Sequence, residues 1–86
     1  MSYSVFLHPQ VIRFLERIPE EDVKRIKAKL SELVNPYSVK ASKLRGHKDA
    51  FKIRVGDYRI LYTVNDRKRV VVVFKVDRRG RVYKRI

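Results

Sequence analysis

The sequence has 86 residues, with 22 Lys and Arg against nine Asp and Glu, a formal net charge of +13, and no cysteine. This length supports one modest hydrophobic core, so we expect a single domain over residues 1–86. The lack of cysteine excludes disulfides and thiolate metal sites, and no apolar run approaches the roughly twenty residues that cross a bilayer. We therefore expect a soluble, cytoplasmic protein with no signal peptide and no membrane partner.

The positive charge is concentrated in the second part of the chain. Residues 1–36 carry six basic and five acidic side chains, whereas residues 37–86 carry sixteen basic and four acidic ones. The electrostatic field of so positive a surface attracts polyanions, chiefly nucleic acid. A surface enriched in charge only because of a high-temperature origin would carry both signs in balance. The imbalance therefore favours a binding role.

The first part of the chain predicts a strand followed by a helical hairpin. Aromatic and β-branched residues favour a strand over residues 3–7, which ends before Pro9. Apolar residues at helical spacing then predict two helices, separated at Pro19 and ended before Pro36. The apolar stripes are Val11, Phe14, Leu15 and Ile18 in the first helix and Val23, Ile26, Leu30 and Leu33 in the second.

Residues 51–64 predict an antiparallel hairpin around Gly56-Asp57, a pair that suits a two-residue turn. One face of this hairpin carries the apolar side chains Phe51, Ile53, Val55, Tyr58, Ile60 and Tyr62. The opposite face carries Lys52, Arg54 and Arg59, with no acidic residue expected among them. Like charges directly opposite each other destabilise a strand pair by about 0.2–1 kcal/mol, so this face favours a site for an anion.

The segments around the hairpin are less regular in sequence. Residues 37–50 lack a sustained period and predict an irregular basic connection, while residues 65–68 predict a polar turn. Residues 69–77 predict a strand that is apolar on both faces and therefore interior to the sheet. Residues 78–81 then predict a turn, and residues 82–86 close the chain. We expect an α+β fold that begins with a strand and in which a two-helix hairpin packs on one face of a small antiparallel β-sheet.

Other kinds of chemistry find little support in the sequence. Paired-histidine RNA chemistry needs two histidines near one phosphate, but His8 precedes the first helix and His47 lies in the basic connection. The four Asp residues of the second part are scattered over predicted loops and turns, so we expect no metal and no cofactor. Tyr83 lies between Arg81 and Lys84, cations that favour the ionised form of a phenol. A proton-accepting role and a core role for Tyr83 are equally open from these residues.

Three stretches, in this order of elements, resemble the RelE branch of the RelE/ParE toxin superfamily. They are KLRGHKDAFKIRVGDYRILYTV (residues 43–64), VVVVFKV and the closing RRGRVY (residues 78–83), and the resemblance covers nearly the whole chain. It implies a RelE-like fold and a ribosome-dependent mRNA endonuclease, or mRNA interferase, that uses the RNA 2′-hydroxyl and no metal. It also implies three partners: an acidic RelB-type antitoxin, mRNA and the A site of the ribosome.

The resemblance further implies site residues on the hairpin and in the tail. Its catalytic positions match Lys52, Arg54, Arg59, Arg79 and Tyr83. Arg54 stands where the best-known members have lysine, which keeps the charge but not the ability to donate a proton. Arg59 and Arg79 would hold the phosphate, Lys52 would orient or activate the 2′-hydroxyl, and Tyr83 would stack on a base or transfer a proton. The other cations expected to bind RNA or the ribosome are Lys40, Lys43, Arg45, Lys48, Arg78, Arg81 and Lys84.

Two other functions fit parts of the same pattern. A ParE-like toxin has the same fold but acts on DNA gyrase, and the full set of basic residues on the hairpin argues against it. A non-catalytic RNA-binding or ribosome-binding module is supported by net charge alone, and it predicts binding without cleavage.

Overall fold

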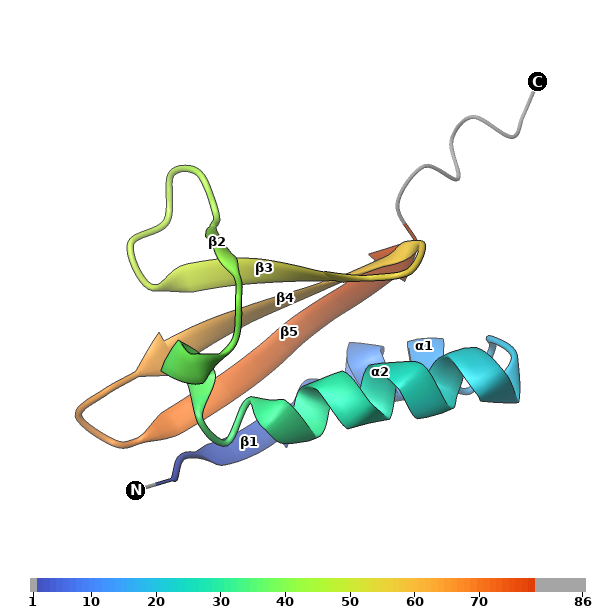
Figure 1. The fold of residues 1–86 in the computed structure, drawn as a ribbon, viewed down its shortest axis with the longest axis horizontal. Coiled ribbons are helices and arrows are strands. Elements are labelled where there is room, and N and C mark those ends of the chain that lie inside the picture. Colours follow the sequence, from blue (N-terminus) through green and yellow to red (C-terminus); the bar gives the residue numbers. More distant parts are fainter. Residues whose placement is uncertain (1, 79–86) are drawn as a thin grey trace.

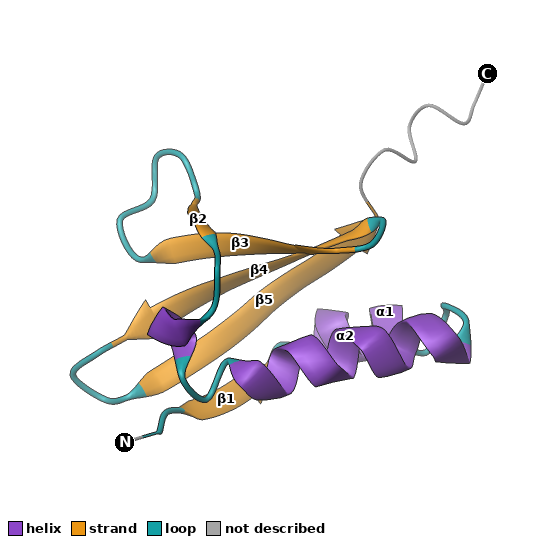
Figure 2. Ribbon diagram, in the orientation of Figure 1, coloured by secondary structure: helices purple, strands orange, loops and turns teal. Residues whose placement is uncertain are grey.

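The structure is a computed structural model that describes residues 2–78 (Figure 1). Its elements are β1 (Ser4–Leu7), α1 (Pro9–Leu15), α2 (Glu20–Glu32), the 3-10 turn η1 (Pro36–Ser38), β2 (Ser42–Lys43), β3 (Ala50–Val55), β4 (Tyr58–Asn65) and β5 (Val70–Arg78). Both helices lie on one side of the sheet (Figure 2), which confirms the predicted α+β fold. Neither described helix has the length and apolar character needed to span a bilayer.

The five strands form one sheet in the order β1-β5-β4-β3-β2. Strand β5 lies inside the sheet, as its apolar sequence predicts. The predicted antiparallel pairing holds for β2 with β3, β3 with β4 and β4 with β5, whereas the N-terminal strand β1 runs parallel to β5, so the sheet is mixed. After β1 the chain forms the two helices and then strands β2 to β5, and β5 lies beside β1, which forms one edge of the sheet. A connection of this length is what parallel neighbours require.

The β3–β4 hairpin has the predicted register, with Val55 opposite Tyr58 and Arg54 opposite Arg59. Gly56 has a φ of 58°, a left-handed conformation that glycine adopts without a steric penalty. A positive φ at the first central position of a two-residue loop is typical of a type II′ turn, whose twist matches that of the strands. The turn therefore fixes which side chains share a face of the hairpin.

The hydrophobic core lies between the helices and the sheet. Helix α1 begins at Pro9 after His8, whose Nδ1 accepts a hydrogen bond of 3.0 Å from the backbone N–H of Gln10 and so caps the helix. Most residues of the two predicted apolar stripes pack into this core, but α1 ends at Leu15, so Ile18 packs against the core from beyond the helix and the first helix is shorter than predicted. The buried cluster consists of Val11, Leu15, Ile26, Leu30, Leu33, Ile53, Tyr58, Ile60, Tyr62, Val64, Val71, Val73 and Val76. Burial of this face leaves the opposite side of the sheet, here called the outer face, uncovered by the helices.

The connection between α2 and β3 is more ordered than its sequence predicts. The expectation of an irregular segment over residues 37–50 is wrong in two places, because η1 begins this segment and β2 forms within it. Strand β2 pairs with β3 through Ser42 opposite Lys52 and Lys43 opposite Phe51. A strand of two residues is too short for its alternation to be seen in a sequence.

Strand β5 contains a β-bulge that changes which side chains face the core. The register pairs Tyr62 with Val73 but Leu61 with Lys75, so Phe74 is the extra residue. Val71 and Val73 face the helices before the bulge, and Val76 faces them after it. The bulge therefore places Lys75 and Asp77 on the outer face.

Candidate nucleic-acid interface

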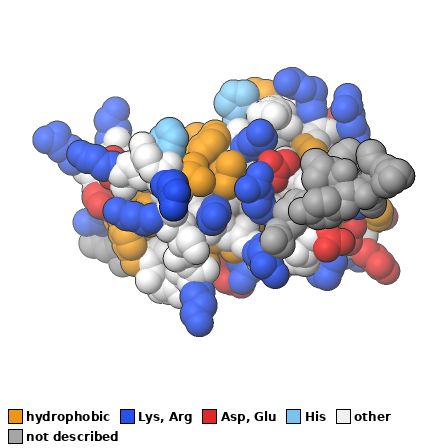
Figure 3. All heavy atoms as spheres, turned by 90° about the horizontal axis from the view of Figure 1, so that it is seen from above, with side chains coloured by type: hydrophobic (Ala, Val, Ile, Leu, Met, Phe, Trp, Pro, Cys, Tyr) orange, Lys and Arg blue, Asp and Glu red, His pale blue; other side chains and the backbone are white. Residues whose placement is uncertain are grey.

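Four cations project from the outer face of three neighbouring strands. They are Lys52 and Arg54 on β3, Arg59 on β4 and Lys75 on β5. The structure thus brings together the three described residues among the predicted catalytic ones and adds Lys75. Seen from the side away from the helices, Lys and Arg side chains surround an apolar patch (Figure 3). A cationic surface of this kind suits the backbone of a nucleic acid.

The expectation that this face lacks an acidic residue is wrong. Asp77 lies directly opposite Arg59 on β5 and accepts hydrogen bonds from its Nε at 3.0 Å and its Nη2 at 2.9 Å. Nζ of Lys75 lies 3.9 Å from Oδ2 of the same carboxylate. The hydrogen bonds to Asp77, followed by its charge, raise the pKa of Arg59. The side chains of Lys52 and Arg54 make no hydrogen bond or ion pair within residues 2–78, and Arg54 still lies directly opposite Arg59.

Arg78 lies on the helix side of the sheet instead of the outer face. Its Nη2 donates a hydrogen bond of 2.9 Å to the hydroxyl of Tyr58, and its guanidinium carbon lies 5.0 Å from the centre of that ring. The same hydroxyl donates a hydrogen bond of 2.7 Å to Asp22 in the first turn of α2. This bond is the main reason why the pKa of Asp22 is lowered, whereas burial and then this bond raise the pKa of Tyr58. Arg78 thereby connects the end of β5 to α2, and its binding to RNA stays a prediction.

The remaining predicted cations fall into two groups. Those of the connection and β2 are exposed, namely Lys40, Lys43, Arg45 and Lys48. Those of the tail lie outside the described residues, and so does the predicted catalytic tyrosine: Arg79, Arg81, Tyr83 and Lys84. His47 is exposed in the loop before β3, where its backbone N–H bonds to Leu44. Within residues 2–78 no three His, Asp or Glu side chains gather as a metal site would require.

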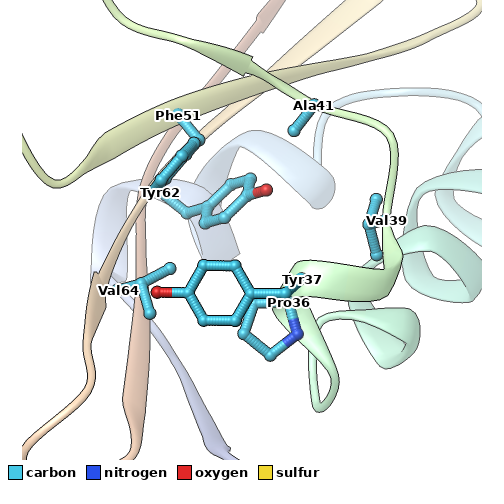
Figure 4. Close-up of a pocket in the computed structure, with 7 residues that line it drawn as sticks. All are labelled: Pro36, Tyr37, Val39, Ala41, Phe51, Tyr62 and Val64. Carbon is cyan, nitrogen blue, oxygen red and sulfur yellow. The ribbon is translucent and has the colours of Figure 1, made fainter.

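A second polar cluster joins distant parts of the chain at the other end of the sheet. The hydroxyls of Tyr3 and Tyr37 each donate a hydrogen bond of 2.7 Å to Oδ1 of Asp66, in the turn between β4 and β5. This contact, with a smaller effect of burial, raises the pKa of Tyr37 to about 12. Tyr37 also lines a mainly apolar cavity of about 150 Å³ between η1 and strands β3 and β4 (Figure 4). The strand residues that line it, Phe51, Tyr62 and Val64, pack in or against the core on the helix side of the sheet, so the cavity is not part of the cationic outer face.

Sequence reasoning missed Lys75 and Asp77 as members of the outer face. Both belong to a strand whose four successive valines give no alternation, and the bulge at Phe74 then shifts the phase. The sequence does show an Asp at the end of one predicted strand, Asp77, and an Arg near the start of another, Arg59, which suggests that the two could pair. That signal needs the register, which the sequence does not contain.

Comparison with known proteins places the chain in a family. The family described as ParE toxin of type II toxin-antitoxin system, parDE, matches residues 5–83. The mRNA interferase toxin RelE of Escherichia coli strain K12 is 31% identical over 83 residues, which cover 94% of this chain and 87% of that protein. The chain belongs to the RelE/ParE toxin family.

Solved structures of RelE/ParE family members have the same fold. The isolated E. coli RelE toxin superposes with a TM-score of 0.80 at 30% identity, covering 95% of this chain and 92% of that one. RelE in the archaeal RelE-RelB complex from Pyrococcus horikoshii OT3 gives a TM-score of 0.76 at 32% identity, covering 94% and 99%. Because both matches span nearly the whole of each chain, the described helices and strands are arranged as in these RelE structures.

Proposed function

We propose that this protein is the toxin of a type II toxin-antitoxin system and acts as a ribosome-dependent mRNA endonuclease. The observation that carries the proposal is the convergence of Lys52, Arg54 and Arg59 on the uncovered face of the sheet. The chain is also similar over most of its length to a protein named as an mRNA interferase. The whole chain, residues 1–86, acts as one toxin domain.

The reaction requires little from the protein besides positive charge and correct geometry. The 2′-hydroxyl of RNA attacks the adjacent phosphorus, its proton leaves to a base, and the 5′-oxygen departs as it takes up a proton. Negative charge grows on the phosphate oxygens in the transition state, and a well-placed donor there typically accelerates a reaction by about 10²–10³. Arg59 and Arg79 supply such donors, and Arg54 supports them.

The proposed site residues are less suited to transferring protons than to binding phosphate. A guanidinium keeps its proton at any physiological pH, so Arg54 and Arg59 bind the phosphate without exchanging protons with it. Lys52 orients or activates the 2′-hydroxyl, and Tyr83 stacks on a base or takes part in proton transfer. Because these residues offer only modest acid-base power, we assign the alignment of the mRNA strand to the A site of the ribosome.

An acidic RelB-type antitoxin is the proposed protein partner. The P. horikoshii relative was solved as a complex of RelE with RelB, and the net charge of +13 calls for an acidic partner. Such a partner neutralises the outer face and keeps it from RNA. Because the proposed target is the translating ribosome, we propose that the protein acts in the cytoplasm.

A ParE-like action on DNA gyrase is the second candidate, because the matching family is described by its ParE members. A ParE-like toxin inhibits supercoiling and leaves mRNA intact. A third possibility, a non-catalytic RNA-binding module, predicts binding to ribosomes without cleavage. Net charge alone supports that module, and similarity to a named mRNA interferase argues against it.

One experiment separates the three functions. Primer extension on an mRNA in a reconstituted translation system, with and without the protein, reports new 5′ ends within translated codons, while a gyrase supercoiling assay runs beside it. The proposal predicts cleavage that depends on translation and unchanged supercoiling. Inhibited supercoiling with intact mRNA indicates the ParE-like function, and ribosome binding without new 5′ ends indicates the module.

A further inference from the structure

The guanidinium of Arg59 is held by one carboxylate at two points. Nε of Arg59 donates to Oδ1 of Asp77 at 3.0 Å and Nη2 donates to Oδ2 at 2.9 Å. A two-point contact between a guanidinium and a carboxylate fixes the plane of the guanidinium as well as its position. Arg54, which faces Arg59 across the hairpin, has no such contact within residues 2–78. Arg59 is therefore the oriented member of the facing pair.

The β-bulge in β5 is what brings Asp77 to this position. If the alternation set by Val71 and Val73 continued through the strand, residue 77 would face the helices. The extra residue, Phe74, shifts the phase by one, so that Val76 enters the core and Asp77 emerges opposite Arg59. Bulges are common beside active sites, where they redirect a side chain.

The geometry of the pair leaves one edge of the guanidinium available. A guanidinium has five N–H donors, of which Asp77 accepts the one on Nε and one of the two on Nη2. Within residues 2–78 the donors left are one on Nη2 and both on Nη1, which lie together on the end of the side chain. This end edge has the spacing that binds two oxygens of a phosphate. The Arg59 side chain is 40% exposed, so it is only partly covered by the rest of the described protein.

We propose that Asp77 is a positioning residue for RNA cleavage, which fixes Arg59 so that the free edge of its guanidinium meets the reacting phosphate. This inference rests on the proposed function. A two-point ion pair of this geometry also helps to hold β4 and β5 together, so the test below measures kcat and KM beside thermal unfolding. A carboxylate beside an anion-binding group also repels the anion. Asp77 therefore improves the geometry of the transition state at a cost in RNA affinity.

The substitution Asp77→Asn tests this role, because Asn keeps the shape of the side chain and removes its charge. A loosened Arg59 lowers kcat for cleavage of ribosome-bound mRNA by about tenfold or more. The KM does not rise, because a negative charge has been removed from the RNA-binding face. Asp57→Asn is the matched control: it makes the same change of charge in the turn of the hairpin, where Asp57 has no ion pair within residues 2–78, and it leaves kcat unchanged.

Three outcomes decide the inference. A lower kcat with an unchanged or lower KM, together with no further loss when Asp77→Asn is added to Arg59→Ala, supports it. A kcat for Asp77→Asn equal to or above that of the wild type overturns it, because Asp77 is then neutral or inhibitory. An equal fold-loss of kcat when Asp77→Asn is added to Arg59→Ala also overturns it, since the effect is then independent of Arg59.

Two controls keep this test separate from folding and from the proposed function. Asp77→Thr, which suits a strand, replaces Asp77→Asn if thermal unfolding shows that the latter is misfolded. Failure of the wild type to cut mRNA contradicts the proposed function itself, whereas normal cutting by the wild type and by Asp77→Asn contradicts only this inference.

Discussion

The substitution Arg54→Thr should stabilise the free protein while it weakens cleavage. Arg54 lies directly opposite Arg59, and such like-charged pairs destabilise a sheet by about 0.2–1 kcal/mol. Asp77 offsets part of the charge of Arg59, so we use the lower part of that range, about 0.2–0.5 kcal/mol. For a domain of this size, about 1 kcal/mol corresponds to 4–8 °C, which gives an expected gain of about 1–4 °C in Tm.

Thermal unfolding at low and high salt measures this gain. Thr also suits strands better than Arg or Lys does, so the control is Lys43→Thr, which makes a similar change on β2 opposite Phe51. The repulsion is the excess stabilisation of Arg54→Thr over Lys43→Thr. It should shrink when the Debye length falls from about 30 Å at 0.01 M salt to about 3 Å at 1 M. An excess of zero at low salt, or one that salt does not change, would refute the reasoning.

Four further substitutions probe the site and the contacts that support it. Tyr58→Phe removes the hydroxyl between Asp22 and Arg78, which should cost about 1 kcal/mol; a Tm equal to that of the wild type contradicts this. Tyr37→Phe tests a pH dependence: with a pKa raised from 10.0 to about 12, Tyr37 stabilises the fold fully below pH 10 and loses this contribution between pH 10 and 12. The difference in unfolding free energy between wild type and variant, measured with urea, should close over that range, and a constant difference argues against it. Arg79→Ala and Tyr83→Ala should each abolish growth arrest and mRNA cleavage with unchanged circular dichroism, and normal cleavage by both variants would remove them from the site.

The hairpin could be predicted in detail because two local signals agree. Gly56-Asp57 fixes the length of the loop, and the alternation of side chains with a period of two assigns each residue to a face. The register that pairs Arg54 with Arg59 follows from these signals alone. The two helices could also be predicted from the sequence, since their apolar residues repeat at helical spacing and a proline separates them.

Features that depend on distant pairing were not accessible from the sequence. The parallel direction of β1 depends on β5 as its neighbour, and the strand β2 exists only through its pairing with β3. The bulge at Phe74 arises among apolar residues that fit either face, so the place of Asp77 beside Arg59 is visible only in the structure. The contacts of Tyr3 and Tyr37 with Asp66 join parts of the chain whose separation of 63 and 29 residues leaves no local signal.

The most direct measurement is the rate at which the purified protein cuts mRNA in the A site of programmed ribosomes, compared with Arg59→Ala. The cationic outer face predicts rapid cutting by the wild type and a loss of about 10²–10³ in rate for the variant, with the variant still folded and still bound to ribosomes. No cutting by the wild type, or equal cutting by both proteins, would contradict the claim that this face is the site of RNA cleavage.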